Sequence, residues 1–146
     1  MHGKTIDQMY VGQFALLNKT ITDADVHIFA GVTGDMNPVH LDDLYASYSI
    51  FQQRIAHGGF IAGLFSTVLG TVLPGLGTIY LRQDSKFVKP VFIGDTVSIK
   101  VEVTSIDEKR NRVTLKTIAT NQHDQEVVIG EAVVMPPKKE NEHEQH

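Results

Sequence analysis

The sequence contains no cysteine among its 146 residues. Disulfide bonds, thiolate nucleophiles, cysteine-based zinc sites and iron–sulfur clusters are therefore excluded. The phosphate-binding patterns G-x-G-x-x-G and G-x-x-x-x-G-K-[ST] are also missing. Basic residues number 13 against 17 acidic ones, and the resulting net charge of -4 argues against a nucleic-acid partner. The sequence therefore contains no motif that indicates a metal or a cofactor.

Long apolar runs are scarce as well. The N-terminal stretch MHGKTIDQMY has no apolar run that could act as a signal peptide, so we expect a cytoplasmic protein. One run, residues 58–73, carries no charge and has apolar residues on nearly every face, which predicts a helix buried on all sides. A membrane span is the alternative. We expect no span, because the run is shorter than the roughly 18–20 residues required and contains three internal glycines.

The rest of the pattern predicts an α+β fold. Thr22 and Asp25 form a capping-box pattern before a first helix, which the glycines at 31 and 34 should end. A second short helix is expected at 41–49. Residues 13–20 look like a short strand, and period-two alternation of β-branched residues predicts strands within four further segments: 77–91, 95–107, 112–122 and 126–136.

An antiparallel sheet of about five strands that curls around the long helix would bury both elements. We expect one domain over residues 1–137. The polar segment 138–146 follows two prolines and has no periodicity, so it is expected to be a disordered tail.

The stretch GDMNPVH places Asp35 five residues before His40. Neighbours on one helix face lie three or four residues apart, and Pro38 disfavours a helical Asn37, so this stretch is predicted to bend. A carboxylate and an imidazole brought together by a bend can share one water and exchange protons with it. The alternative is an ordinary turn, with His40 packed against the next helix.

The stretch AHGG precedes the long helix. Glycine at 58 would let a ligand carbonyl approach the unpaired N–H groups and the positive dipole end of that helix. The alternative is that these glycines only allow a tight entry. His57 is expected to fix the loop, and the alternative for His57 is a role as a ligand. Ser66 lies eight residues later, where a buried hydroxyl would either bond back to the preceding turn or hold another group in a pocket.

Three motifs, GDMNPVHLD, AHGGFIAGLFS and FVKPVFIGDTV, resemble in order and spacing the MaoC-like (R)-specific enoyl-CoA hydratases. The resemblance runs from about Gly12 to Pro136. It implies a hot-dog fold, in which a sheet wraps a long central helix, and a homodimer. It further implies reversible hydration of a trans-2-enoyl-CoA to an (R)-3-hydroxyacyl-CoA, without a metal or other cofactor.

The resemblance also implies roles for particular residues. Asp35 and His40 match the catalytic pair that activates water, and Gly58 matches the residue whose N–H polarises the thioester carbonyl. Ser66 and Asn37 would support the site. Leu69 and Val134 would line the acyl pocket.

Two other classes of protein remain open at this point. One is a hot-dog thioesterase, or a 3-hydroxyacyl-thioester dehydratase that acts on carrier-protein substrates. The other is an acyl-CoA binding module without turnover. The D-x-N-P-x-H loop favours the hydratase over the first class. The intact Asp35, His40, Gly58 and Ser66 argue against the second.

Overall fold

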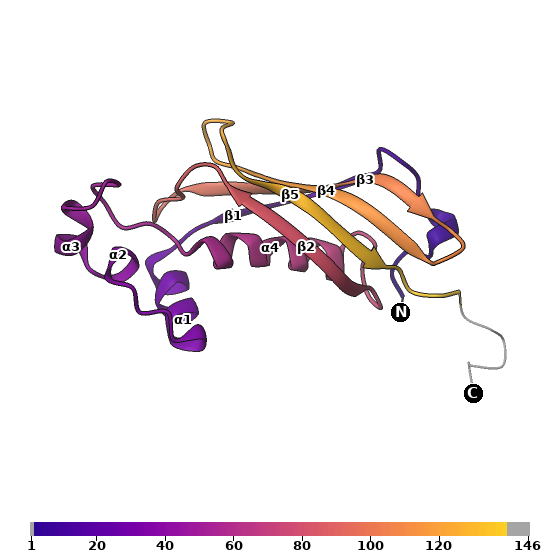
Figure 1. Ribbon diagram of the computed structural model, residues 1–146, viewed down its shortest axis with the longest axis horizontal. Coiled ribbons are helices and arrows are strands. Elements are labelled where there is room, and N and C mark those ends of the chain that lie inside the picture. The colour runs from indigo at the N-terminus through magenta and orange to yellow at the C-terminus, as the bar shows by residue number, and fades with distance from the viewer. Residues whose placement is uncertain (1, 140–146) are drawn as a thin grey trace.

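The computed structural model describes residues 2–139, in which a five-stranded antiparallel sheet packs along one long helix (Figure 1). The strand order is β1-β3-β4-β5-β2. The strands are β1 (Phe14–Thr20), β2 (Ile79–Phe87), β3 (Thr96–Asp107), β4 (Arg112–Thr120) and β5 (Glu126–Met135). The helices are a short 3-10 turn (Ile6–Gln8), α1 (Asp23–Thr33), α2 (Pro38–Leu41), α3 (Asp43–Ser47) and α4 (Gly58–Thr71). The α+β prediction and all five strands are confirmed.

The sheet buries alternate residues of its central strands, as the sequence pattern predicts. On β3 the inward side chains are 1% exposed or less, and on β4 they are completely buried. Tight hairpins join β3 to β4 and β4 to β5, with Asn111 and Asp124 at positive φ. Asn and Asp tolerate this left-handed conformation better than other non-glycine residues. The buried positions of β3 and β4 are Val97, Ile99, Val101, Val103, Val113, Leu115, Thr117 and Ala119.

Helix α4 is buried on one face only, so the prediction of burial on all sides was wrong. Its buried residues recur at helical spacing, whereas Gly63, Ser66 and Thr67 on the other face are exposed. A single sheet layer covers one side of a helix, and the uncharged sequence gave no sign of which side that would be. The buried residues are Ile61, Leu64, Phe65, Val68 and Leu69.

The segment from α1 to α3 projects beyond one end of the sheet (Figure 1). Its start is the predicted capping box: Asp25 N–H donates to Thr22 Oγ1 at 3.1 Å, and Thr22 N–H donates to Asp25 Oδ2 at 3.0 Å. Helix α1 continues through Gly31 and ends at Thr33, with Gly34 as its cap. Gly31 therefore does not end the helix. The short helix expected at 41–49 is present as α3, capped by Asp42, and α2 is an additional helical turn that was not predicted.

Among the residues that the structure describes, no helix is both long and apolar enough to cross a membrane. Most of the tail expected at 138–146, namely residues 140–146, lies outside the described residues.

The pairing of β5 with β2 depends on a close backbone approach at Gly130, and this generates a stability prediction. A methyl group there would lie 1.9 Å from the carbonyl oxygen of Asp84. Gly130→Ala should therefore force the strands apart and lower the free energy of unfolding by about 1–3 kcal/mol. Gly31→Ala is the control, because a methyl group at this position within α1 meets open space and should add up to about 0.5–1 kcal/mol. Urea unfolding followed by circular dichroism measures both, and an unchanged midpoint for Gly130→Ala would contradict the prediction.

Candidate active site

The bend that carries Asp35 is built by short polar side chains. Helix α1 stops at Gly34, whose φ of 79° is left-handed and whose N–H donates to the Ala30 carbonyl at 2.8 Å. The next N–H, that of Asp35, donates to Thr33 Oγ1 at 3.2 Å. Asp35 Oδ1 then accepts a hydrogen bond from Asn37 N–H at 3.3 Å. The chain thus turns directly after the helix, and the Asp35 carboxylate is held against the backbone of that turn.

Asn37 and Pro38 start the next helix and so aim His40. The Asn37 side chain accepts a hydrogen bond from Val39 N–H at 3.1 Å, and Pro38 occupies the first position of α2. Both residues suit these positions, since Asn is a strong N-cap and proline has no N–H to leave unpaired there. His40 follows on the single turn of α2. The predicted bend is confirmed, and Asn37 shapes it as a cap.

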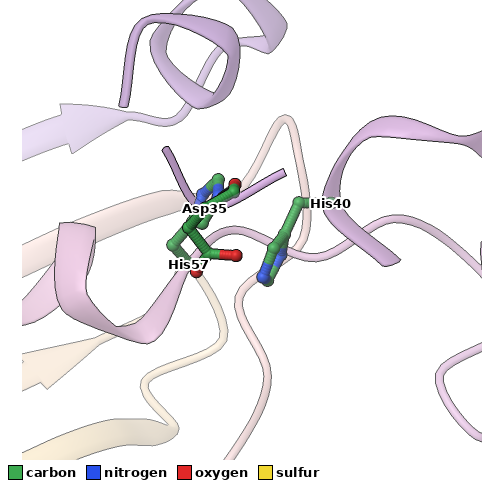
Figure 2. A group of neighbouring side chains, drawn as sticks. All are labelled: Asp35, His40 and His57. Carbon is green, nitrogen blue, oxygen red and sulfur yellow. Dashed lines mark hydrogen bonds between the residues drawn. The ribbon is translucent and has the colours of Figure 1, made fainter. Parts of the chain in front are cut away.

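Three side chains meet at this bend, two of them predicted as a pair (Figure 2). A carboxylate oxygen of Asp35 and ring nitrogens of His40 and His57 all lie within 4.8 Å of one another. Asp35 is exposed, whereas His40 is 8% exposed and His57 only 2%. One solvent-facing acid therefore stands beside two buried imidazoles.

The tautomer of His40 follows from its partner. Nδ1 lies 2.7 Å from the carbonyl oxygen of Ile55, which can only accept, so Nδ1 carries the proton. In the neutral ring Nε2 is then a bare acceptor. Burial lowers the pKa of His40 below its usual value, although the Ile55 hydrogen bond and the Asp35 carboxylate partly oppose this shift. His40 is therefore a neutral base near pH 7.

Arg54 is hydrogen-bonded to the backbone of His40, and the sequence analysis did not predict this contact. Its Nε donates to the His40 carbonyl oxygen at 2.7 Å, while its terminal nitrogens pair with Asp23 of α1 and, at 3.7 Å, with Asp43 of α3. The Arg54 side chain is only 11% exposed. It thereby ties α1 and α3 to the backbone of His40 on α2. The only trace of this in the sequence is an arginine between two apolar motifs, which indicates no partner.

The three side chains are poorly arranged for a metal ion, despite their ligand types. The rings of His40 and His57 are stacked, with centroids 3.8 Å apart and planes inclined by 28°. A metal must lie close to the plane of each imidazole that binds it, about 2 Å from the nitrogen. The planes of two stacked rings do not meet close to their nitrogens, so the rings cannot both bind one ion without turning. The geometry instead suits proton exchange with a water.

The start of α4 provides unpaired backbone donors next to an apolar cavity. The N–H groups of Gly58 and Gly59 have no acceptor within residues 2–139, as expected for a first helical turn. The cavity, of about 440 Å³, includes Gly58, Ile55, Phe51 and Phe87 in its lining. Its lining includes neither Asp35 nor His40. In a single chain, the Asp35–His40 pair thus lies outside the cavity. Ile55 connects the two, because it lines the cavity and its carbonyl oxygen contacts the His40 ring.

Three residues assigned by resemblance lie away from the bend. Ser66 is exposed, so the expectation of a buried hydroxyl was wrong, and the helical rise places it about 12 Å along α4 from Gly58. Leu69 and Val134 are 1% and 0% exposed in the hydrophobic core, and neither lines the cavity beside Gly58. Their roles in the acyl pocket, and that of Ser66 in supporting the site, stay predictions.

The sequence of the chain is similar to a known protein family and to characterised relatives. The family model described as MaoC like domain matches residues 11–127. The chain is 47% identical over 128 residues to an (R)-specific enoyl-CoA hydratase of Rhodospirillum rubrum, covering 88% of each chain. It is 46% identical over 134 residues to a 3-hydroxybutyryl-CoA dehydratase of Methylorubrum extorquens, covering 92% of this chain and 85% of that one.

The fold is similar to that of a solved hydratase structure. An unliganded (R)-hydratase of Pseudomonas aeruginosa superposes with a TM-score of 0.90 at 43% sequence identity, covering 94% of this chain and 88% of that chain. The predicted hot-dog fold is therefore confirmed.

The environment of His40 generates a titration prediction. Because burial favours the neutral ring, NMR should find a midpoint below the ordinary value near 6.5. The unfolded chain binds the proton more readily, so this contribution to stability is complete above pH 6.5 and is lost as the pH falls through the folded pKa. Asp35→Asn removes a charge that raises the pKa, so it should lower the midpoint further. A midpoint at or above 6.5 would contradict the assigned cause.

Proposed function

The chain belongs to the MaoC-like domain family, and on this premise we propose that it is a cytoplasmic, homodimeric (R)-specific enoyl-CoA hydratase. The proposed reaction is reversible addition of water to a trans-2-enoyl-CoA, which gives an (R)-3-hydroxyacyl-CoA. One observation carries the proposal: an exposed carboxylate and a buried, neutral imidazole, whose Nε2 is bare, converge at a bend. The relatives named above carry names for both directions of this chemistry, hydratase and dehydratase.

The backbone at the start of α4 supplies the electrophilic half of the mechanism. We place the thioester carbonyl oxygen against the N–H of Gly58, where the positive end of the helix dipole stabilises developing negative charge. Polarisation of that carbonyl withdraws electron density from the conjugated double bond and leaves the β-carbon electrophilic. The apolar cavity next to Gly58 suits an acyl chain or the thioester arm.

The Asp35–His40 pair supplies the nucleophilic half. A water that donates one hydrogen to the Asp35 carboxylate and the other to His40 Nε2 keeps a lone pair free for the β-carbon. As the carbon–oxygen bond forms, one acceptor takes a proton from the water and the double-bond electrons move toward the thioester. The same proton then passes to the α-carbon, which restores the pair. Because one water supplies both groups from one side, addition is syn, and the step uses no metal or redox cofactor.

Two unpaired surfaces of the chain support the proposed dimer. Strand β2 ends the sheet and carries Ile79, Leu81 and Phe87 with about half of each side chain exposed. The outer face of α4, with Gly63 and Ser66, is uncharged and exposed. A second copy joined along β2 would cover the apolar edge and extend the sheet. The same pairing is the proposed setting in which Ser66 supports a site.

The function is tested with crotonyl-CoA, following the enoyl absorbance and the release of free CoA thiol in the same sample. Loss of absorbance without thiol release is expected. Asp35→Asn and His40→Ala should each lower kcat by about 100-fold or more, because each removes one acceptor of the water's protons. Ser66→Ala should cost less, about tenfold at most, since it touches none of the reacting atoms in this mechanism.

Matched controls come from the hairpin between β4 and β5. Asp124→Asn and His123→Ala make comparable changes at exposed positions far along the chain from the bend, and both should leave kcat unchanged. Thiol release would favour a thioesterase, and the absence of both signals would favour a binding module. Turnover on a carrier-protein thioester but not on crotonyl-CoA would favour the carrier-protein dehydratase. Near-normal activity of Asp35→Asn or His40→Ala would overturn the mechanism.

The dimer is tested by light scattering, which should give twice the 16.2 kDa mass of the chain. Leu81→Lys should shift the population toward monomer, because a charge would be buried at the joined edge. Tyr10→Lys, at an exposed apolar position in the N-terminal segment, is the control and should leave the mass unchanged. A monomeric mass for the unaltered chain would contradict the proposal.

A further inference from the structure

His57 is the third side chain of the bend, and the mechanism above gives it no task. It stands just before α4 and is 2% exposed. Its Nε2 lies 3.0 Å from the backbone carbonyl oxygen of Asp35, 22 residues earlier in the chain. One face of its ring stacks on His40, and Phe29 of α1 packs against it at 4.7 Å between centroids. Figure 2 shows its ring behind Asp35 and beside His40.

The contact with Asp35 fixes which nitrogen of His57 carries a proton. A carbonyl oxygen only accepts, so Nε2 must be the donor. In the neutral ring Nδ1 is then a bare acceptor, and it is buried without any hydrogen-bond partner in residues 2–139. Such an orphaned polar atom costs stability. A residue that served only to fill space would be apolar at this position and would avoid that cost, so the hydrogen bond from Nε2 is the feature that distinguishes histidine here.

A proton relay through His57 does not fit the same geometry. Nδ1 has no partner to pass a proton to, and the stacked arrangement puts His40 against the ring face rather than against a ring nitrogen. Nε2 meets a backbone carbonyl rather than the Asp35 carboxylate. The remaining role is structural: the buried His57 ring is hydrogen-bonded to the backbone of Asp35 and can fix its position.

We propose that His57 is a positioning residue that anchors the backbone of Asp35 through its Nε2–H and thereby holds the carboxylate within reach of the water at His40. The inference rests on the proposed hydratase function. Within residues 2–139, the other side-chain hydrogen bonds of Asp35 are local, to Thr33 and Asn37, which belong to the bend itself. His57 connects it to the start of α4, where the carbonyl-polarising N–H of Gly58 is located. A displacement of about 1 Å between such groups costs about 100-fold in rate.

Two amide substitutions separate this role from packing. His57→Gln places its amide nitrogen close to the position of Nε2, so it can still donate to the Asp35 carbonyl. His57→Asn is one methylene shorter, and its amide reaches only the position of Nδ1. Both remove the stacked ring and both are uncharged. We expect His57→Gln to retain kcat within about tenfold and His57→Asn to lose about 100-fold, with KM nearly unchanged in both because neither group touches the substrate.

A second readout does not depend on turnover. The Asp35 carboxylate raises the pKa of His40, so an Asp35 that has moved away should leave His40 with a lower NMR midpoint in the Asn variant than in the Gln variant. In the unaltered protein, nitrogen chemical shifts should report His57 protonated at Nε2 and bare at Nδ1. The midpoint is read from the His40 signal of the folded molecules, so it does not depend on what fraction of the Asn variant folds.

Several outcomes would overturn the inference. Equal kcat and equal His40 midpoints in the two variants would do so, as would activity that falls only in step with the folded fraction measured by circular dichroism. A His57 protonated at Nδ1 would also overturn it. An unaltered protein that does not hydrate crotonyl-CoA would instead count against the proposed function, while the tautomer and the His40 midpoints would still decide whether His57 anchors Asp35.

Discussion

The site depends on one set of hydrogen bonds, those that run from residues 54–57 to the bend. Arg54 holds the His40 carbonyl, the Ile55 carbonyl holds the His40 ring, and His57 holds the Asp35 carbonyl. The bend itself has only an eleven-residue helix before it and a four-residue helix after it, and it projects beyond the sheet. The bend must therefore be held rigid by contacts with other parts of the chain. Residues 54–57 can hold it because they are fastened to the sheet side of the molecule, with Ala56 N–H donating to the Val91 carbonyl at 2.7 Å.

The same arrangement sets the chemistry of His40. A histidine exposed on a mobile loop would titrate near its ordinary value and would sample both tautomers. Here burial favours the neutral form, and the Ile55 carbonyl selects the tautomer with Nε2 bare. The Asp35 carboxylate stays in solvent a few ångströms away and limits how far the pKa falls. The contacts that fix the position of the imidazole therefore also determine its tautomer and favour its neutral form.

Local sequence patterns predicted the parts of the structure whose causes are local. The Thr22–Asp25 capping box and the Asn37–Pro38 bend depend on contacts within a few residues. The strands pair over long stretches of the chain, but the alternation that reveals their buried face is a local pattern. The one-sided burial of α4 could not be predicted in this way, because an uncharged helix gives no sign of how many layers will cover it. Arg54 and the acceptor of His57 were equally hidden. Their partners lie 14 and 22 residues away, and only the folded chain brings them together.

The start of α4 shows how helix stability and the site compete for one residue. An N-cap is usually Ser, Thr, Asp or Asn, whose side chain satisfies an N–H of the first turn and adds about 0.5–2 kcal/mol. His57 occupies the cap position of α4 but makes no such bond, because its ring is turned toward Asp35. The N–H groups of Gly58 and Gly59 stay unpaired within the described chain as a result. A conventional cap would release Asp35 and would place its own oxygen where the proposed mechanism needs a thioester carbonyl, so both halves of the chemistry favour an imidazole at this position.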